Sequence, residues 1–325
     1  MACTFVALLA SSQAADFAAR RSTPLNPPPA PAVMAAAPTP SVWPIEETKD
    51  HEIFSNGLRV EDSLEVANEP RSYRLVDRSD PPASGPERTV PAGIVFHTTE
   101  SDLAPLEPRE TRTLQRIGRE LLLYVRQKRS YHFVIDRFGG VHRIVRESDS
   151  ANHAGHSAWA DSKWLYAGLN ESFLGVAFEA QTQVGYQIIT EAQIHAARVL
   201  VEMLRDKYNI PAEDCVTHAQ VSLNPAANLI GWHTDWADRF PFASLGLPDN
   251  YRLPSPLIDE FGFGYDAAYV KATGPDVWSG LRLADERVRE AAARNGSSAA
   301  VYRRFLQTRY RELAGLHHAE SPEEN

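Results

Sequence analysis

Residues 93–99 read GIVFHTT, a short run rich in β-branched and aromatic side chains. A run of this length and composition predicts a buried strand of a sheet. His97 lies near the end of the run, beside Thr98 and Thr99, so its side chain is placed to reach into a cleft at the strand end. Taken alone, a histidine in this position is more often structural than a ligand, and its role depends on the segments around it.

A second buried strand is predicted at residues 173–181, FLGVAFEAQ. Alternation along a strand places Glu179 on the same face as Gly175 and Ala177. These small neighbours leave room in front of the carboxylate. A carboxylate on a core strand is costly unless it is paired or used, so Glu179 is a candidate functional residue.

Helical patterns alternate with the predicted strands. Residues 107–127 have an apolar stripe at helical spacing, and a helix from Thr190 opens with a capping-box pattern completed by Gln193. Residues 130–145, SYHFVIDRFGGVHRIV, predict a hairpin. The alternation predicts an α/β fold with a central mixed β-sheet flanked by helices. Two further helices, at 281–294 and 299–315, predict an added helical C-terminal region.

Residues 217–236, THAQVSLNPAANLIGWHTDW, combine two histidines and an aspartate around a loop rich in Pro, Gly and Asn. His218 stands at one end, and His233 and Asp235 stand two residues apart at the other, where an extended chain points them the same way. Imidazoles and a carboxylate delivered by a loop suit a catalytic metal, which needs a few protein ligands and one open position. The alternative is a set of polar surface residues in a loop.

Composition excludes several classes of protein. The 325 residues are 43% hydrophobic and 23% charged, with a net charge of -9, which is ordinary for a globular protein. No Lys/Arg block of the kind that binds nucleic acid is present, so nucleic acid is not an expected partner. No apolar run approaches the ~20 residues of a transmembrane helix. Two cysteines without a CxxC partner predict neither a thiolate zinc site nor a disulfide framework.

The N-terminal segments have a different composition from the rest of the chain. Residues 1–21 contain a short apolar run followed by small residues, as in a signal-like leader, and residues 22–44 form a Pro/Ala-rich linker. Together they predict export to the periplasm or cell envelope, with a disordered tail on a cytoplasmic protein as the alternative. Residues 45–90 are predicted to form a β-hairpin extension around an Asn-Gly turn, 91–245 the main domain, and 246–325 a loop and helical C-terminal extension.

The order of motifs FHTT, SYHFVIDRFG, NHAGHSAW, LGVAFEAQ, THAQVS and HTD resembles the zinc-dependent N-acetylmuramoyl-L-alanine amidases of the type-2 amidase family. Peptidoglycan-recognition proteins share that fold. The resemblance covers roughly residues 90–245. It implies a zinc hydrolase that cleaves the amide bond between N-acetylmuramic acid and L-alanine in peptidoglycan or muropeptides.

The resemblance also implies roles for individual residues. The zinc ligands would be His97, His218 and Asp235. Glu179 would match the strand glutamate of the family, in a Gly-Ile-Glu-like context, and act as general base. His233 would occupy the catalytic position two residues before the third ligand, and Tyr131 would match the tyrosine of the Tyr-His-Phe motif; either could stabilise the oxyanion.

Substrate contacts are expected beside the site. The loop at 148–159, SDSANHAGHSAW, carries His153 and His156, which we expect to line a groove. Trp159 and Trp232 lie near site segments and could stack on sugar or peptide, the alternative being an ordinary place in the core.

The segment around the third ligand departs most from the pattern of the family. Asp235 follows His218 by 17 positions, a wider gap than the family commonly shows, and Trp236 follows the aspartate where the family commonly has proline. The loop therefore carries an insertion. His233 could itself bind the metal, with Asp235 orienting it.

Three rival functions remain open at this point. A peptidoglycan-recognition module of the same fold would bind without cleaving. A two-His-one-carboxylate iron oxygenase shares the His-x-Asp spacing at 233–235, but such enzymes usually supply a further histidine downstream on an all-β barrel. A cysteine hydrolase would need Cys215 and His218, which on one strand point to opposite faces; Cys215 is more simply a small core residue.

Overall fold

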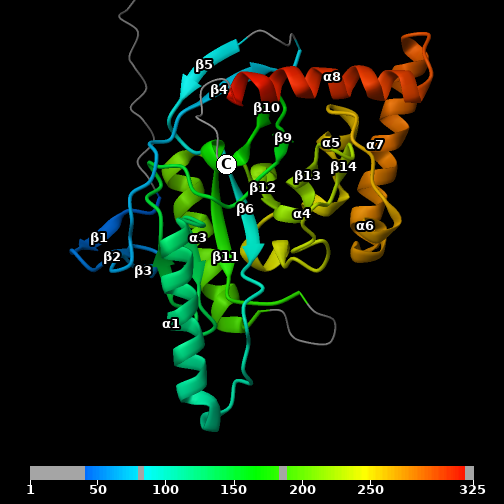
Figure 1. Cartoon of the computed structure of the whole chain (residues 1–325). Helices are drawn as coiled ribbons and strands as arrows, with labels where there is room; N and C mark the ends of the chain where they lie inside the picture. The colour runs from blue at the N-terminus through cyan, green and yellow to red at the C-terminus, as the bar shows by residue number, and fades with distance from the viewer. Residues whose placement is uncertain (1–40, 80–83, 183–188, 319–325) are drawn as a thin grey trace, which may run out of the picture. The chain divides into compact units, whose positions relative to one another are not determined.

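An eight-stranded mixed sheet lies at the centre of the computed structural model (Figure 1). The structure describes residues 41–79, 84–182 and 189–318, so the predicted leader and nearly all of the predicted linker lie outside the described residues. The strands of this sheet, in spatial order, are β1 (Pro44–Glu47), β2 (His51–Phe54), β3 (Arg59–Glu61), β8 (Val141–Arg143), β7 (Phe133–Ile135), β11 (Phe173–Phe178), β6 (Gly93–Thr98) and β12 (Cys215–Thr217).

The two strands predicted to be buried are neighbours in the middle of the sheet. β6 and β11 pair in parallel, and every residue of both strands is buried. Their register places Ala177 beside His97. β12 pairs in parallel with the other edge of β6, so the carboxyl ends of β6, β11 and β12 meet at one edge of the sheet. Side chains that follow these strands are thereby brought together.

Helices cover both faces of this sheet. On one face, α1 (Thr111–Lys128) packs Val125 against Val134 and Ala177. On the other face, α3 (Glu191–Tyr208) packs Leu200 and other apolar residues against the opposite side chains of β6 and β11. The predicted capping box at the start of α3 is confirmed. The expected α/β fold with a central mixed sheet and flanking helices is present.

A second sheet of four strands packs beside the first. In spatial order it contains β5 (Ser84–Arg88), β4 (Tyr73–Asp77), β10 (Trp164–Ala167) and β9 (Ala158–Ala160). The sequence pattern predicted no strand where β5 forms. β5 contains Pro86 and lies at the edge of its sheet, where proline is tolerated because one side of the strand needs no backbone partner.

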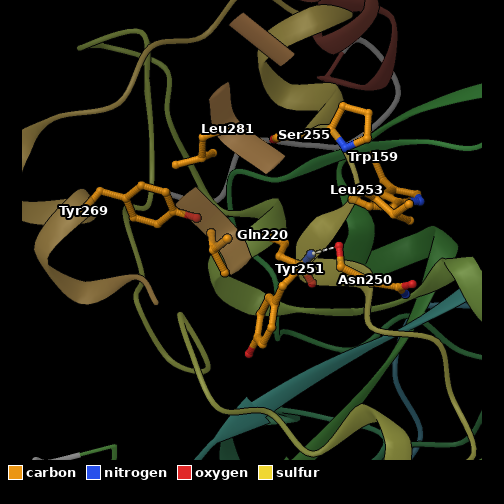
Figure 2. Close-up of a pocket in the computed structure, with 10 residues that line it drawn as sticks. Trp159, Gln220, Asn250, Tyr251, Leu253, Ser255, Tyr269 and Leu281 are labelled. Carbon is orange, nitrogen blue, oxygen red and sulfur yellow. Dashed lines mark hydrogen bonds between the residues drawn. The ribbon is translucent and has the colours of Figure 1, made fainter. Parts of the chain in front are cut away.

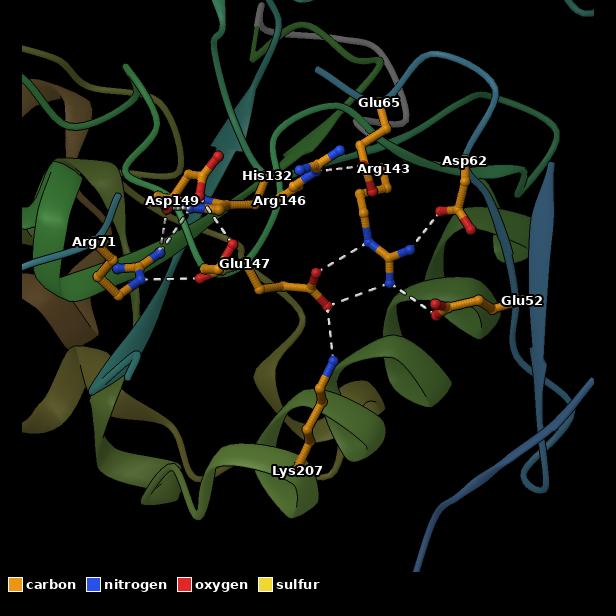
Figure 3. A network of polar contacts seen from close by, with 11 residues as sticks. Glu52, Asp62, Glu65, Arg71, His132, Arg143, Arg146, Glu147, Asp149 and Lys207 are labelled. Atoms are coloured by element: carbon orange, nitrogen blue, oxygen red, sulfur yellow. Dashed lines mark hydrogen bonds and ion pairs between the residues drawn. The ribbon is translucent and has the colours of Figure 1, made fainter. Parts of the chain in front are cut away.

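The N-terminal hairpin is joined to the central sheet. β2 and β3 pair around the predicted Asn-Gly turn, and β3 continues the sheet by pairing in parallel with β8. Arg143 of β8, only 4% exposed, forms ion pairs with Glu52 at 2.9 Å and with Asp62. It also pairs with Glu147 at 3.0 Å, and Lys207 of α3 contacts the same carboxylate at 3.3 Å (Figure 3). One buried guanidinium thus connects the hairpin to the centre of the fold.

The C-terminal region consists of short helical turns followed by two long helices. α7 (Pro275–Arg294) begins six residues before the predicted start, with Pro275 in its first turn, and α8 (Ala299–His318) follows. Leu281 and Leu313 belong to the same buried cluster as the central sheet, so both long helices pack onto the rest of the fold. The short elements are η1 (Pro108–Glu110), α2 (Leu169–Ser172), η2 (Ala212–Asp214), α4 (His218–Val221), β13 (Leu223–Asn224), β14 (Leu229–Ile230), η3 (Phe242–Leu245), η4 (Asn250–Arg252), α5 (Pro256–Asp259) and α6 (Ala267–Ala272).

Of the helices that the structure describes, none has the length and apolar composition needed to cross a membrane.

Candidate metal centre

Three predicted ligands meet at the carboxyl edge of the central sheet. His97 belongs to β6, His218 is the first residue of α4 directly after β12, and Asp235 lies in the loop beyond β14. One potential ligand atom from each residue lies within 4.8 Å of the others. Among the described residues, this is the group of His, Cys, Asp and Glu side chains arranged to hold a metal ion.

Asp235 lies between the two imidazoles. Its Oδ1 is 2.9 Å from His218 Nδ1, and its Oδ2 is 3.5 Å from His97 Nδ1. The backbone N–H of Thr98 donates to Oδ2 at 3.4 Å. The loop between His218 and Asp235 contains the small β13–β14 hairpin, and the chain after it returns Asp235 to the histidines.

The electrostatics of the centre favour an ionised Asp235 and a neutral His97. Burial acts to raise the pKa of Asp235, but the neighbouring His218, which hydrogen-bonds to this carboxylate, and the contact with His97 outweigh the burial and hold the pKa below its usual range. Burial, followed by the neighbouring His218, lowers the pKa of His97 to about 4. Neutral imidazole with its lone pair free and an ionised carboxylate are the forms that bind a metal.

The contact between His97 and Asp235 has the spacing of two ligands of a tetrahedral zinc ion, whereas His218 Nδ1 and Asp235 Oδ1, 2.9 Å apart, lie at hydrogen-bond distance. Zinc–ligand bonds of about 2.0–2.1 Å place neighbouring ligand atoms roughly 3.3 Å apart. The 3.5 Å between His97 Nδ1 and Asp235 Oδ2 is close to that value. His218 Nε2 is buried without a hydrogen-bond partner among the described residues, which leaves this ring with unused donor or acceptor capacity at the site.

His233 stands beside the cluster and not in it. Its ring stacks on that of His218, with centroids 4.6 Å apart and planes 19° from parallel. Its backbone N–H donates to Ser222 Oγ at 2.9 Å, which fixes the loop. Asp235, and not His233, is therefore the residue that the structure groups with His97 and His218.

Two aromatic residues flank the centre. Tyr131 has a left-handed backbone with φ of 62°, and its ring centroid is 5.1 Å from that of His97. Burial, followed by the charge of Asp235, raises the pKa of Tyr131, so its hydroxyl keeps its proton at neutral pH. Trp232 is 62% exposed beside His233, where its ring is open to a bound molecule.

Glu179 is not brought to this centre. Its Oε2 accepts a hydrogen bond from the backbone N–H of Arg137 at 3.1 Å, and both carboxylate oxygens face Gly118 of α1. Burial raises the pKa of Glu179. The residue of β11 that lies beside His97 is Ala177, two positions earlier. In a Gly-Ile-Glu context the glutamate is the second residue after the glycine, and here that position after Gly175 is Ala177.

The predicted substrate residues separate into exposed and buried pairs. His156 is exposed, as Trp232 is. His153 is buried, and its Nδ1 lies 3.1 Å from His97 Nε2. Trp159 is 5% exposed and donates from Nε1 to Asp214 Oδ1 at 2.9 Å.

Figure 2 shows Trp159 lining a pocket with residues of the C-terminal region, among them Asn250, Tyr251 and Leu281. His153 and Trp159 therefore do not line an open groove. The loop that carries them packs into the protein, which its Ser/Asn/Gly composition did not indicate.

The comparison with protein families identifies the central part of the chain. Residues 87–236 match the sequence profile of Amidase_2, the N-acetylmuramoyl-L-alanine amidases. This segment, 150 of the 325 residues, is similar to the amidases of that family. The matched segment ends one residue after Asp235, so it contains the whole cluster and excludes the N-terminal hairpin and the C-terminal helices. A comparison with curated proteins found no match.

Several solved structures, amidases among them, are also similar to the chain. The amidase LysC from Clostridium intestinale URNW is 22% identical, covering 56% of this chain and 93% of that chain, at a TM-score of 0.31. The amidase AmiD from E. coli is 24% identical over 53% of this chain and 64% of that chain, at 0.36. AmpDh3 from Pseudomonas aeruginosa is 20% identical over 61% and 74%, at 0.36. Because these TM-scores are low, the similarity to amidases rests on the sequence match of residues 87–236.

Proposed function

We propose that the protein is a zinc-dependent amidase that cleaves the amide between the lactyl group of N-acetylmuramic acid and L-alanine of the stem peptide. The observation that carries the proposal is the convergence of His97, His218 and Asp235 inside the segment that matches the amidase family. His97, His218 and Asp235 would hold the ion, leaving one position open to water or substrate.

In the proposed reaction, zinc would activate the water molecule, and side chains of the protein would transfer the protons. Bound zinc would lower the pKa of a water molecule to near ~7 and polarise the amide carbonyl. The protein must then accept the proton of that water and deliver a proton to the leaving amine. These steps need groups within hydrogen-bond reach of the centre.

His233 is the best placed group for both proton transfers. Its ring stacks on the ligand His218 and is partly exposed, so it borders the open side of the cluster. Burial and the neighbouring His218 lower the pKa of His233, which keeps the ring neutral and able to accept a proton at neutral pH. The position of Glu179 against Arg137 and Gly118 supports His233 over Glu179 as the base.

Tyr131 is suited to stabilise charge on the substrate. Its hydroxyl remains a hydrogen-bond donor because burial and Asp235 raise its pKa. A donor held beside the metal stabilises the negative charge that develops on the carbonyl oxygen. Trp232 and His156, both exposed, would contact the sugar or peptide outside the centre.

The composition of residues 1–44 supports a location for this activity. A signal-like leader and a Pro/Ala-rich linker suit an exported protein tethered in the periplasm or cell envelope, where peptidoglycan lies. We keep export as a proposal, tested by comparing the size and location of the protein with and without residues 1–21.

The experiment that tests the function uses metal removal on purified peptidoglycan. Chelation should abolish release of stem peptides, and added zinc should restore it. His218→Ala should lose zinc affinity and activity together, whereas His195→Ala, at an exposed position of α3, should retain both. Wild-type protein that binds zinc but releases nothing would instead be a recognition module, and activity that survives chelation would exclude the zinc mechanism.

A further inference from the structure

We propose that His153 is a positioning residue of the metal centre, which holds His97 in the tautomer whose Nδ1 is free to bind the ion. The sequence placed His153 in a substrate groove, and the structure buries it behind His97. The inference rests on the proposed function, because it concerns the same centre. It adds a residue that does not touch the metal or the substrate.

The backbone determines which nitrogen of His153 carries hydrogen. His153 Nε2 lies 3.3 Å from the carbonyl oxygen of Phe173. A carbonyl oxygen can only accept, so Nε2 must be the donor. His153 is only 7% exposed, and a second proton would place an unpaired charge at this buried position, so the ring holds a single proton. Its Nδ1 is therefore an acceptor.

The hydrogen bond between the two rings then determines which nitrogen of His97 carries hydrogen. His97 Nε2 is 3.1 Å from His153 Nδ1, so Nε2 of His97 donates and carries its proton. Nδ1 of His97 then carries no hydrogen, and its lone pair faces Asp235 Oδ2 at a distance of 3.5 Å between the two atoms. Two acceptors at this distance repel each other unless a cation lies between them. The opposite tautomer would place the lone pair of His153 Nε2 against the Phe173 carbonyl, which is unfavourable.

Packing holds the His153 ring in this position. The ring lies over Gly175 of β11, where a Cβ would come within 2.6 Å of His153 Cγ. The backbone N–H groups of His153 and Ala154 both donate to Asn170 Oδ1, at 3.0 and 2.8 Å. The ring also meets His97 edge-on, with centroids 5.2 Å apart. The absent side chain at 175 thus provides the space that the positioning residue fills.

Arg71, in the N-terminal extension, contacts the Phe173 carbonyl that accepts the hydrogen bond from His153. Arg71, 1% exposed, donates from Nη1 to the same Phe173 carbonyl at 3.4 Å and to that of Glu171. Its Nη2 donates to the carbonyl of Asp149 at 3.0 Å and contacts His132 (Figure 3). Arg71 precedes the matched amidase segment, so residues outside that segment help to fix the acceptor that orients His153.

The direct test determines the tautomers of His97 and His153 in the metal-free protein. Long-range ¹H–¹⁵N spectra of the histidine rings should show His97 as the Nε2–H form and His153 as the Nε2–H form. A His97 ring protonated on Nδ1 would overturn the proposal. This reading needs no variant and no activity, so it is independent of whether the protein cleaves peptidoglycan.

Two variants separate positioning from packing. His153→Phe keeps a ring but removes the acceptor, whereas the amide oxygen of His153→Asn can accept from His97 near the position of Nδ1. We expect zinc affinity, measured by competition with a chelator, to fall about 10–100-fold in His153→Phe and to stay within about 3-fold of wild type in His153→Asn. His195→Ala serves as the control at an exposed histidine.

The outcomes distinguish this inference from the function it rests on. Wild-type affinity in His153→Phe, with His97 still in the Nε2–H form, would overturn the positioning role. If His153→Phe does not fold, the His153→Asn result decides: loss of the His97 tautomer in that variant contradicts the proposal. Normal tautomers and zinc binding without cleavage would refute the proposed function and leave the positioning role standing.

Discussion

At the scale of single residues, the metal centre is organised by Asp235. It contacts both histidines, and those contacts lower its pKa despite its burial. His97 and Ala177 lie side by side on adjacent strands, so the sheet itself offers no carboxylate at the position next to the metal. In the proposed mechanism, proton transfer therefore depends on groups that enter from the loops.

This arrangement predicts unequal effects at His233 and Glu179. His233→Ala should lower kcat by roughly 10²–10⁴-fold, the usual contribution of a general acid–base group, while zinc affinity changes little. Glu179→Gln should keep kcat within about 10-fold of wild type, because the carboxylate lies against Arg137 and Gly118. Steady-state kinetics on a muropeptide would measure both. A larger loss in Glu179→Gln than in His233→Ala would restore the glutamate as the base.

A second prediction at this scale concerns pH and Asp214. Burial raises the pKa of Asp214 to about 7 from 3.8. Because the folded pKa is the higher one, the contribution of Asp214 to stability is full below about pH 4 and is lost as pH rises to about 7. Asp214→Asn keeps an acceptor for Trp159 and removes the titration.

The measurement is the free energy of unfolding of both proteins across pH. Relative to Asp214→Asn, the wild type should lose up to a few kcal/mol between about pH 4 and pH 8. The difference isolates Asp214 from the buried histidines, which are common to both proteins. A difference that stays constant or grows with pH would contradict the assignment.

At the scale of elements, β11 joins the core to the metal centre. One face packs under α3, and the other presents Gly175 to His153. Gly175→Ala should therefore destabilise the protein by about 1–3 kcal/mol, as overpacking does, and weaken zinc binding as His153 shifts. Gly118→Ala is the matched control, because its Cβ would meet Glu179 at an ordinary 3.6 Å and alanine favours the helix. Denaturant unfolding should show opposite signs for the two changes; equal signs would contradict the packing argument.

The N-terminal hairpin gives another prediction at this scale. Arg143→Leu removes the buried partner of three carboxylates and should lower the free energy of unfolding by about 3–5 kcal/mol. Arg146→Leu removes an ion pair to Glu65 in which the arginine is 55% exposed, and should change stability little. Thermal unfolding of both variants provides the comparison. Similar losses in the two would mean that the buried network does not anchor the hairpin.

At the scale of the whole molecule, local patterns predicted the elements, and long-range packing decided what the side chains do. The strands at 93–98 and 173–178 and the capped helix α3 carry their signals in adjacent residues, and each was predicted. β5 was not, because its pairing with β4 gives a Pro-containing segment its strand form.

The metal cluster was predicted because its residues recur in a family motif order. Glu179 was assigned to the centre because it was matched to the strand glutamate of the family, although Ala177 holds the second position after Gly175. The pairing of β6 with β11 places Ala177 beside His97. His153 was placed in a groove because the composition of its loop did not indicate burial. Its burial depends on Gly175, a residue far along the chain whose missing side chain makes the space.

The central claim, hydrolysis of the muramyl amide, is tested most directly by mass spectrometry of muropeptides digested by the zinc-loaded protein in ¹⁸O-labelled water. The account predicts free, unlabelled stem peptide beginning with L-alanine, and an intact muramic acid sugar that carries ¹⁸O in its lactyl carboxyl group. Label in a peptide carboxyl group, or cleavage between sugars, would contradict it.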